Sequence, residues 1–459
     1  MSTRYYRTVG ALALVTTVGL SLAACSKDDK SGDANAKVTI TVDCPPLKTD
    51  NGGKSLEHWN ADIAAFQKAH PNVTIKSVSV GSQCDNPPDF TARLQGGTQA
   101  DIFYGYMTDL NQVLDAGQAE DITSYVNAST VPNWDNVMAN IKAPYMDHGK
   151  LYAIPYDAYS MGIVINKTLF KQAGLDPTKP PATWQEVAAD AKKIAALGNG
   201  VTGYSEYSAG NTGGWHFTAE LYSRGGQVLS NDGKSASFNN DMGQAVLKNL
   251  HDMRFTDNSV GEKQLQQWPD LLTNAAAGKV GMYIGAPDSI TAIVTTFKGK
   301  FSDWAMGPMP GDSGQAKATL GGGAGYFIKR GLSPAQIKAG VAWVNYEKLT
   351  PGQGQLDYAS MKTNGLPVGL PQPQIWTPGS DVQKKDDDLK KANSNLDLAD
   401  YAPFVTNPIT IRAEPAQAQA IYAVLDSCMS AVLTQKDANI ADLLKGAESK
   451  VNTLLNEKK

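Results

Sequence analysis

The pattern of apolar and polar positions alternates between two periods along most of the chain. Residues 38–42, 73–80 and 101–104 are short apolar or β-branched runs that predict strands. Residues 55–69 and 90–94 lie between them and show helical spacing, which in the longer segment is carried by Leu56, Trp59, Ile63 and Phe66. Strands that alternate with helices predict parallel pairing through right-handed crossovers.

A second series of the same kind begins near residue 149. It contains a predicted buried strand over residues 161–165 and a capping box from Thr183 to Glu186 that opens an Ala-rich helix. A helix over 271–277 and a strand over 280–284 follow. Because 459 residues exceed what one core usually supports, two α/β lobes are predicted, and an apolar stripe over 440–455 predicts a closing helix.

Two compositional runs stand out between these elements. Residues 384–391 (Lys-Lys-Asp-Asp-Asp-Leu-Lys-Lys) are a dense run of charge, which we interpret as a solvated face. Residues 321–325 (Gly-Gly-Gly-Ala-Gly) precede the apolar run 326–328, so we expect a close backbone approach or a sharp turn there. No Lys-Ser/Thr pair follows these glycines, so a phosphate-binding loop is not indicated.

The first 25 residues have the pattern of an export signal. Two arginines precede an uncharged apolar run over residues 9–22, which is shorter than the about 20 residues of a membrane span. Leu-Ala-Ala-Cys, ending at Cys25, resembles the lipobox of bacterial lipoproteins. We therefore expect a signal peptide over residues 1–24, a diacylglyceryl group on Cys25 and a flexible tether over 25–37 that anchors the protein outside the bacterial cell membrane.

Composition and cysteines narrow the classes of partner. With 41 basic and 45 acidic residues, the net charge is −4, which lacks the concentrated positive charge of a nucleic-acid-binding protein. Cys44 and Cys84 follow the first two predicted strands, so a disulfide between them is favoured over two free thiols, and Cys428 is expected in the core. The histidines lack metal-ligand spacing, so we expect neither a metal nor a cofactor.

Residues that directly follow strands are candidate ligand contacts, because ligands of parallel sheets bind outside the carboxyl ends of the strands. Asp43 follows the first strand and Asp288 follows the strand that ends at Ile284. A sugar needs flat aromatic surfaces and a few placed polar groups. Trp268, Trp304, Trp343 and Trp376 are interpreted as core or rim residues. The candidate contacts are Asp43, Tyr104, Tyr106, Asp157, Tyr159, Trp215, Asp288, Gly323 and Arg412.

Seven short segments occur in an order and spacing that resemble one protein family. They are residues 66–73, 100–103, 149–155, 164–167, 183–186, 278–282 and 364–367. The chain is similar, over nearly its whole mature length, to the sugar-binding lipoproteins of bacterial ABC importers, to which maltose-binding protein belongs. The resemblance implies a two-lobed α/β fold of the periplasmic-binding-protein type II, in which each lobe has a mainly parallel sheet flanked by helices and hinge crossings join the lobes.

The same resemblance implies how the chain is divided and with what it works. Residues 38–155 and 310–366 are expected in lobe 1, and residues 156–309 and 367–459 in lobe 2. The expected protein is a monomer without catalytic activity. Its expected partners are a mono- or oligosaccharide and the transmembrane permease subunits of an ABC importer.

The resemblance also distinguishes among the candidate contacts. Trp215 falls in a stretch where the family places stacking aromatics, and Tyr159 falls where maltose-binding protein has an acidic contact at the hinge. Asp288 stands where the maltose-type pattern has a tryptophan, which implies a sugar other than maltose. Arg412 lies just before the C-terminal helices, where the family often has a contact.

Two other classes of function stay open. A binding protein for a peptide, a polyamine or a ferric ion is one alternative, and clustered tyrosines such as Tyr104 and Tyr106 suit the last of these. A secreted glycosidase needs two carboxylates about 5–9 Å apart, which Asp43, Asp157 and Asp288 could supply. The sequence shows neither a Gly-x-Ser-x-Gly nor a His-Glu-x-x-His motif and no dense carboxylate cluster, which favours sugar binding without catalysis.

Overall fold

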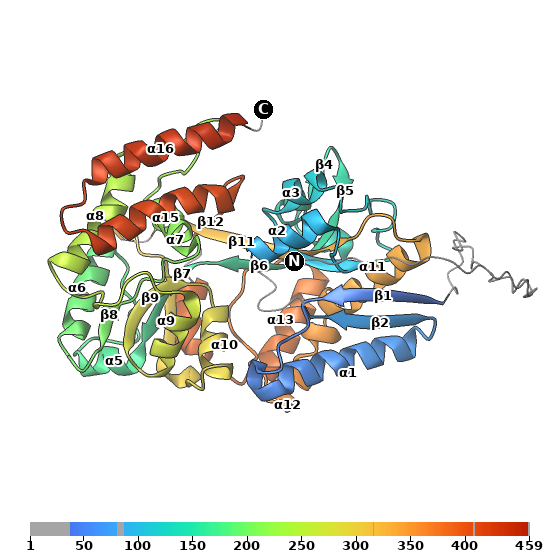
Figure 1. Cartoon of the computed structure of the whole chain (residues 1–459). Helices are drawn as coiled ribbons and strands as arrows, with labels where there is room; N and C mark the ends of the chain where they lie inside the picture. Colours follow the sequence, from blue (N-terminus) through green and yellow to red (C-terminus); the bar gives the residue numbers. More distant parts are fainter. Residues whose placement is uncertain (1–36, 80–86, 315, 407–408, 458–459) are drawn as a thin grey trace, which may run out of the picture.

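The computed structural model describes residues 37–79, 87–314, 316–406 and 409–457. The chain folds into two lobes, each with its own sheet and flanking helices (Figure 1). The predicted signal peptide, Cys25, Cys84 and the tether up to residue 36 lie outside the described residues. Among the described residues, no helix combines the length and the apolarity that crossing a membrane requires.

The first lobe is built on one end of a six-stranded sheet, which starts with the β-branched run of the sequence and continues across the junction into the second lobe. Its order is β12-β11-β3-β1-β2, and β6 pairs with β11. Side chains alternate along β1, so that Ile40 and Val42 are fully buried in the core. The strands are β1 (Val38–Asp43), β2 (Val73–Val78), β3 (Ile102–Tyr106), β6 (Ala153–Ser160), β11 (Ala318–Ile328) and β12 (Thr410–Ala413).

Helices cover this sheet through aromatic contacts made by two residues of the predicted helical stripe. In α1 (Lys54–Ala69), Trp59 and Phe66 pack edge-on against Trp343 of α11 (Pro334–Lys348), with ring centroids 5.5 and 5.3 Å away. A two-stranded hairpin joins β4 (Met146–Asp147) to β5 (Lys150–Leu151). The other helices of this half are α2 (Pro87–Gly96), α3 (Leu110–Asp115), α4 (Ala139–Lys142), α12 (Tyr358–Thr363) and α13 (Asp381–Asn393).

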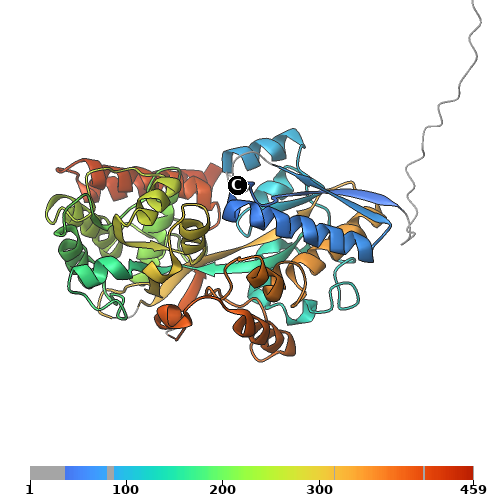
Figure 2. The same ribbon diagram turned by 90° about the horizontal axis from the view of Figure 1, so that it is seen from below.

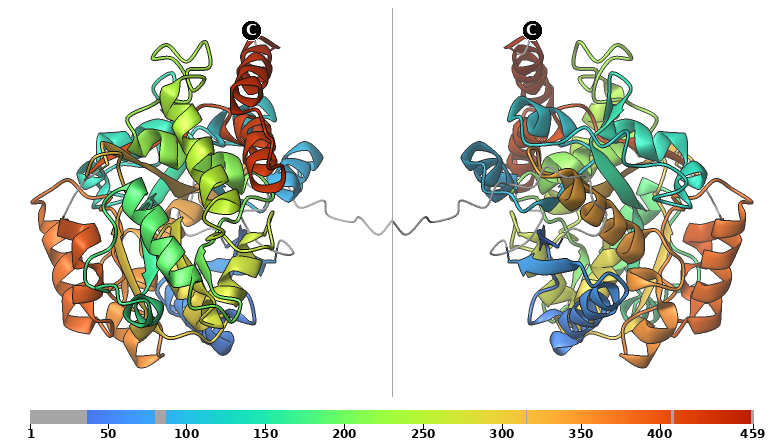
Figure 3. Two further views of the ribbon diagram at one scale, coloured as in Figure 1. Left: turned by 90° about the vertical axis from the view of Figure 1, so that its left-hand side faces the viewer. Right: turned by 90° about the vertical axis from the view of Figure 1, so that its right-hand side faces the viewer.

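The second lobe has a four-stranded sheet in the order β10-β7-β9-β8. Its strands are β7 (Gly162–Asn166), β8 (Thr202–Tyr204), β9 (Val280–Gly285) and β10 (Trp304–Pro308). The predicted capping box is present at the start of α6 (Trp184–Ala195). Its other helices are α5 (Lys167–Gln172), α7 (Thr212–Ser223), α8 (Asp241–Phe255), α9 (Trp268–Ala276), α10 (Asp288–Thr295), α14 (Ala402–Thr406), α15 (Ala418–Thr434) and the predicted closing helix α16 (Ile440–Glu457). Figure 3 shows α15 and α16 in red along one side of the molecule.

Strand directions differ between the lobes. In the first lobe, β1 pairs in parallel with β2 and β3, as predicted. In the second lobe only β8 and β9 pair in parallel, because β7, which continues from the crossing strand β6 and runs away from the junction, lies between β9 and β10, which run toward it. The expectation of a mainly parallel sheet is therefore wrong for the second lobe, although the carboxyl ends of β8, β9 and β10 still face the junction.

Two neighbouring antiparallel strands, β6 and β11, carry the chain between the lobes (Figure 2). On β11, Leu320 belongs to the core of the second lobe and Tyr326 to that of the first, so the chain passes between the cores after residue 320 rather than at residue 310. Ile375 and Val382 also belong to the first core, although the sequence-based division assigns residues after 366 to lobe 2.

Candidate functional site

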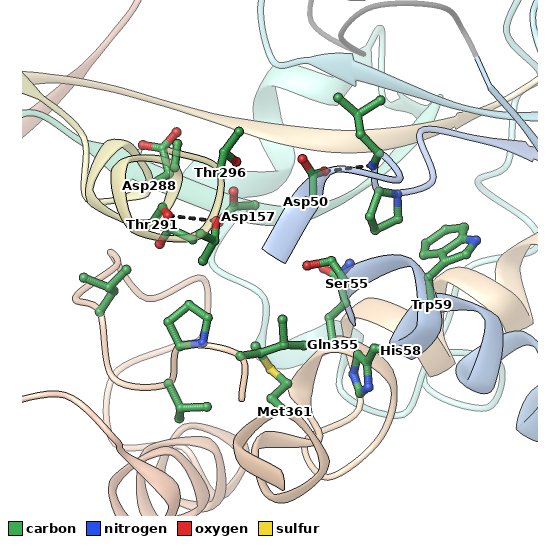
Figure 4. Close-up of a pocket in the computed structure, with 18 of the residues that line it drawn as sticks. Asp50, Ser55, His58, Trp59, Asp157, Asp288, Thr291, Thr296, Gln355 and Met361 are labelled. Carbon is green, nitrogen blue, oxygen red and sulfur yellow. Dashed lines mark hydrogen bonds between the residues drawn. The ribbon is translucent and has the colours of Figure 1, made fainter. Parts of the chain in front are cut away.

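A cavity of about 760 Å³ lies between the two lobes. Its volume falls in the range of about 300–1,000 Å³ that is typical of small-molecule sites. Figure 4 shows Asp288, Thr291 and Thr296 on one wall and Ser55, His58 and Trp59 on another. Further lining residues are Cys44, Pro45, Pro46, Asp50, Asp62, Tyr156, Asp157, Trp268, Phe297, Glu347, Lys348, Tyr358, Met361, Pro367 and Lys390.

The first lobe contributes the loop after β1 and the start of α1. The loop begins at Cys44, whose φ of 61° lies in the left-handed region, and Asp50 fixes the loop by accepting a hydrogen bond from the backbone N of Leu47 at 2.8 Å. Cys44 is disulfide-bonded, and its predicted partner Cys84 lies outside the described residues. One helical turn apart on α1, His58 Nε2 lies 3.5 Å from Asp62 Oδ2 at the cavity wall.

The second lobe contributes two helix starts. Asp288 is the first residue of α10 and follows the carboxyl end of β9, as the sequence analysis predicted. A carboxylate at this position is stabilised by the helix dipole. Trp268 is the first residue of α9 and is partly exposed, and Pro269 fits the second position because that position needs no backbone N–H. These helix starts present a carboxylate and a flat aromatic surface to the cavity.

Asp157, on the crossing strand β6, and the end of α11 also line the cavity. Burial raises the pKa of Asp157 to about 6, and the nearby charge of Asp288 adds to this effect. Burial also raises the pKa of Glu347 to about 8 and lowers the pKa of Lys348. The Lys348 Nζ lies 4.7 Å from the centre of the Tyr156 ring, where a cation–π contact stabilises it.

Of the predicted contacts, Asp157 and Asp288 line this cavity. Asp43 is fully buried beneath it, where its Oδ1 accepts a hydrogen bond from the backbone N of Tyr104 at 2.8 Å and joins the ends of β1 and β3. Tyr104 and Tyr106 pack edge-on, with ring centroids 5.5 Å apart. The predicted contacts that are not among the cavity-lining residues are Asp43, Tyr104, Tyr106, Tyr159, Trp215, Gly323 and Arg412.

Tyr159 and Trp215 meet in a second group, which we name the tyrosine–glutamate cluster and which consists of Tyr159, Trp215, Glu414 and Tyr422. The Tyr159 hydroxyl donates to Glu414 Oε1 at 2.6 Å and accepts from Trp215 Nε1 at 3.2 Å, and the Tyr422 hydroxyl donates to Glu414 Oε2 at 3.1 Å. Sequence reasoning missed Glu414, although it directly follows β12 and so satisfies the same rule that selected Asp43.

Arg412 and Gly323 have packing roles in this structure. The Arg412 Nη1 donates to the backbone oxygen of Gly226 at 2.8 Å, and its guanidinium lies 5.6 Å from the Tyr222 ring centre. A Cβ at Gly323 would lie 2.4 Å from the backbone oxygen of Asp157, so the close approach predicted for these glycines is that of β11 to β6.

Of the four tryptophans that the sequence analysis interpreted as core or rim residues, three lie in the core and one lines the cavity. Trp304, Trp343 and Trp376 are at most 1% exposed, which confirms them as core residues. Trp268 instead lines the cavity. A signal for this was its place next to Pro269 at a helix start, because a residue in the first turn of a helix that faces a lobe junction is well placed to meet a ligand.

A family model described as the bacterial extracellular solute-binding protein matches residues 52–348. The chain belongs to this family. The match extends from the turn before α1 to the end of α11, so it includes both crossing strands and about half of the residues that line the cavity. The resemblance to maltose-binding-type proteins that the sequence analysis stated is thereby confirmed.

Two proteins are similar in sequence to parts of this chain. A putative binding protein of Brucella abortus is 26% identical over 276 residues, which make up 59% of this chain and 61% of that protein. The chain thus spans about three fifths of that relative's length. The multiple sugar-binding protein of Streptococcus mutans is 29% identical over 197 residues, which are 42% of each chain.

Solved structures of the family show the same two-lobed fold. A solute-binding protein of Thermotoga lettingae bound to α-D-tagatose has a TM-score of 0.72 at 21% identity, covering 91% of this chain and 99% of that chain. UgpB of Mycobacterium tuberculosis in complex with glycerophosphocholine has a TM-score of 0.68 at 16% identity, covering 92% and 99%. The periplasmic-binding-protein type II fold expected from the sequence is therefore confirmed.

Proposed function

We propose that this protein is the lipid-anchored solute-binding component of a bacterial ABC sugar importer. It captures a mono- or oligosaccharide between its lobes and delivers it to the transmembrane permease. The observation that carries this proposal is the cavity between the lobes, with both lobes contributing polar and aromatic side chains, in a chain of the solute-binding family.

The lining residues match the two chemical faces of a sugar. Trp268, Phe297 and Tyr358 offer aromatic surface to C–H groups, and Asp50, Asp157 and Asp288 can accept hydrogen bonds from hydroxyls. Micromolar affinity corresponds to about 8 kcal/mol, which several hydrogen bonds of about 1 kcal/mol and one or two stacked aromatics supply once water is excluded.

Closure of the lobes around the ligand completes the proposed mechanism. The cavity wall combines Pro45 and Pro46 of one lobe with Pro287 and Asp288 of the other, so a hinge motion at β6 and β11 changes its width. The ligand stays chemically unaltered, and the importer's cytoplasmic ATPases supply the energy for transport. The tyrosine–glutamate cluster is proposed as a further contact surface, because the family resemblance places stacking aromatics at Trp215.

A thermal-shift screen over mono- and oligosaccharides tests this function. A saccharide at a hundred times its dissociation constant adds about 2.7 kcal/mol to the stability of the folded state, so the melting temperature rises by several degrees. Mass spectrometry of the recovered saccharide then shows an unchanged mass. A panel in which no saccharide shifts the melting temperature, or in which the saccharide is cleaved, contradicts the proposal.

A further inference from the structure

A band of apolar side chains lines part of the cavity. This apolar band consists of Pro45, Leu47, Met361, Leu366, Pro367 and Leu370. Its residues come from two segments, the loop after β1 and the stretch from α12 to residue 370. Figure 4 shows Met361 well apart from Asp157 and Asp288, on another side of the cavity. Leu47 is 39% exposed, so the described residues leave part of this apolar surface uncovered.

The two segments of the apolar band adjoin each other and continue to the aromatic surface of the second lobe. Asn51 Nδ2, in the loop after β1, lies 3.5 Å from the backbone oxygen of Gly365. Leu370 packs against the same core cluster as Trp268 and Phe297, which both line the cavity. The apolar band therefore extends from one lobe to the other, so closure of the lobes brings it around the group that it contacts.

Much of the backbone along this band is already hydrogen-bonded. The Val368 N–H donates to Asn395 Oδ1 at 2.9 Å, and the Val368 oxygen accepts from Asn395 N and Ser394 Oγ, both at 3.1 Å. The Leu366 oxygen accepts from Asn395 Nδ2 at 2.8 Å. Ser394 and Asn395 are not among the described residues that line the cavity. Since the side chains of residues 366–370 (Leu-Pro-Val-Gly-Leu) neither donate nor accept hydrogen bonds, this stretch presents a mainly apolar surface.

An unsubstituted sugar does not complement such a surface. Closure of the lobes removes water, and a hydroxyl that then faces the apolar band has lost its hydrogen bonds to water without gaining others. A buried polar group left without a partner weakens binding about tenfold or more. An apolar group gains instead, because each methylene that it buries strengthens binding about fourfold. The cavity of about 760 Å³ lies in the upper part of the range typical of drug-sized ligands, so it has room for such a group beside a sugar.

We propose that the ligand of this cavity is a glycoside with an apolar aglycone, so that its chemical class is an amphiphilic alkyl or aryl glycoside. The aglycone packs on the apolar band, while the sugar hydroxyls face the polar side chains of Ser55, Asp157 and Asp288. This inference rests on the proposed function and specifies its substrate class. Recognition of both ends of the ligand accounts for the combination of aliphatic side chains and carboxylates in one cavity.

The test uses matched pairs of ligands that differ only in the length of an alkyl chain. They are the methyl and hexyl β-glycosides of glucose, galactose and mannose, titrated calorimetrically into the purified protein below the concentrations at which micelles form. The additional methylenes of the hexyl chain should make the hexyl glycoside of the preferred sugar bind at least about thirtyfold more tightly than its methyl counterpart. 1-Hexanol, which has the chain without the sugar, should bind more weakly than the hexyl glycoside.

Substitutions in the apolar band test where the alkyl chain lies. Met361→Gln keeps the length of the side chain but makes it polar, and Leu47→Gln changes a side chain that is already partly exposed. Each should lower the ratio of the hexyl to the methyl affinity about fivefold or more. Met146→Gln is the matched control, because Met146 is also 39% exposed and is not among the described residues that line the cavity. It should leave the ratio unchanged, and the melting temperatures of all three variants show whether they fold.

The outcomes separate this inference from the proposed function. Equal affinities of the methyl and hexyl glycosides overturn the inference and leave sugar capture standing. A gain from the hexyl chain that persists in both Met361→Gln and Leu47→Gln contradicts the place of the aglycone on the apolar band. Equal binding of 1-hexanol and the hexyl glycosides, with no binding of any methyl glycoside, overturns the inference and sugar capture together. Absence of binding by every glycoside overturns the inference, while the saccharide screen decides the proposed function by itself.

Discussion

Asp43 is a carboxylate that the fold buries completely. Its Oδ1 accepts the Tyr104 backbone N–H, while its Oδ2 accepts no hydrogen bond from the described residues. Burial raises its pKa from 3.8 to about 7. Asp43 therefore orders the end of β1 beside the cavity. When its carboxylate is ionised, its burial lowers the free energy of unfolding.

The sign of this effect gives a prediction for pH. Between about pH 4 and 7 the folded state retains a proton on Asp43 that the unfolded state has lost, so stability falls as the pH rises through this window. Asp43→Asn keeps the acceptor for Tyr104 and should show a smaller fall in the free energy of unfolding between pH 5 and 8. Chemical denaturation at several pH values measures it, with Asp388→Asn as the control. Identical slopes for the Asp43→Asn variant and the wild type would show that Asp43 does not titrate in this range.

Two tryptophans are candidates for the aromatic surface that holds the sugar. Trp268 lines the cavity and is partly exposed, so Trp268→Ala should weaken the best saccharide of the screen about tenfold and leave the unliganded melting temperature within a few degrees. Trp215→Ala tests the surface implied by the family resemblance in the same titration. If both variants keep wild-type affinity, neither ring is a stacking platform.

The sequence predicted where candidate side chains lie along the chain, but not which way they point. Asp43 and Asp288 both follow strands, yet Asp43 turns into the core and Asp288 is exposed at a helix start. That difference depends on the pleat of β1 and on the length of the turn after β9, which local sequence does not encode. For the same reason the local signals at Glu414, which follows a strand, and at Trp268, which begins a helix, did not show what these side chains face.

At the scale of elements, the contact between β6 and β11 determines the geometry of the junction. A Cβ at Gly321 or Gly323 would lie 2.4 Å from a backbone oxygen of β6, and a Cβ at Gly322 would meet the ring of Tyr159 on the same strand. Their sequence pattern predicted a close approach, and the structure shows which strand approaches. The site therefore depends on glycines that do not line the cavity.

Gly323→Ala tests this dependence. The added methyl would lie 2.4 Å from the Asp157 backbone oxygen, so the strands must separate, and we expect a loss of about 1–3 kcal/mol in the free energy of unfolding together with weaker saccharide binding. Gly446→Ala is the matched control, because its position in α16 has open space and the substitution should stabilise the helix by up to about 1 kcal/mol. Equal stabilities of the Gly323→Ala variant and the wild type would contradict the packing argument.

In the charged helix α13, the density of charge did not predict which side chains are buried. Its run of residues 384–391 was predicted to be a solvated face, and Lys384 and Asp388 are exposed. Asp386, however, is 4% exposed and accepts a hydrogen bond from the Tyr358 hydroxyl at 2.9 Å, and Lys390 lines the cavity. One face of the helix is turned inward because α12 packs on it, which charge density alone could not reveal.

At the scale of the whole molecule, two cores joined by crossing strands allow one lobe to move against the other. The family assignment and the fold agree on this arrangement. The lobes were predictable because the seven family-like segments, from residue 66 to residue 367, and the periodicity both extend over the two halves of the fold. The exact passage between cores was not, because it lies inside the single continuous strand β11.

The anchoring of the molecule is a separate prediction. If Cys25 carries the lipid, Cys25→Ser should move the protein from the membrane fraction to the soluble extracytoplasmic fraction of the expressing cells, while saccharide binding by the purified variant stays at the wild-type value. Fractionation with detection of the chain measures this. Retention of the Cys25→Ser variant in the membrane fraction would show that another feature holds it there.

Small-angle scattering of the protein with and without the saccharide that stabilises it most tests the central claim most directly. Capture between two moving lobes predicts a smaller radius of gyration in the bound state, and the saccharide released afterwards should be intact. A scattering profile that does not change at saturating saccharide would contradict the account.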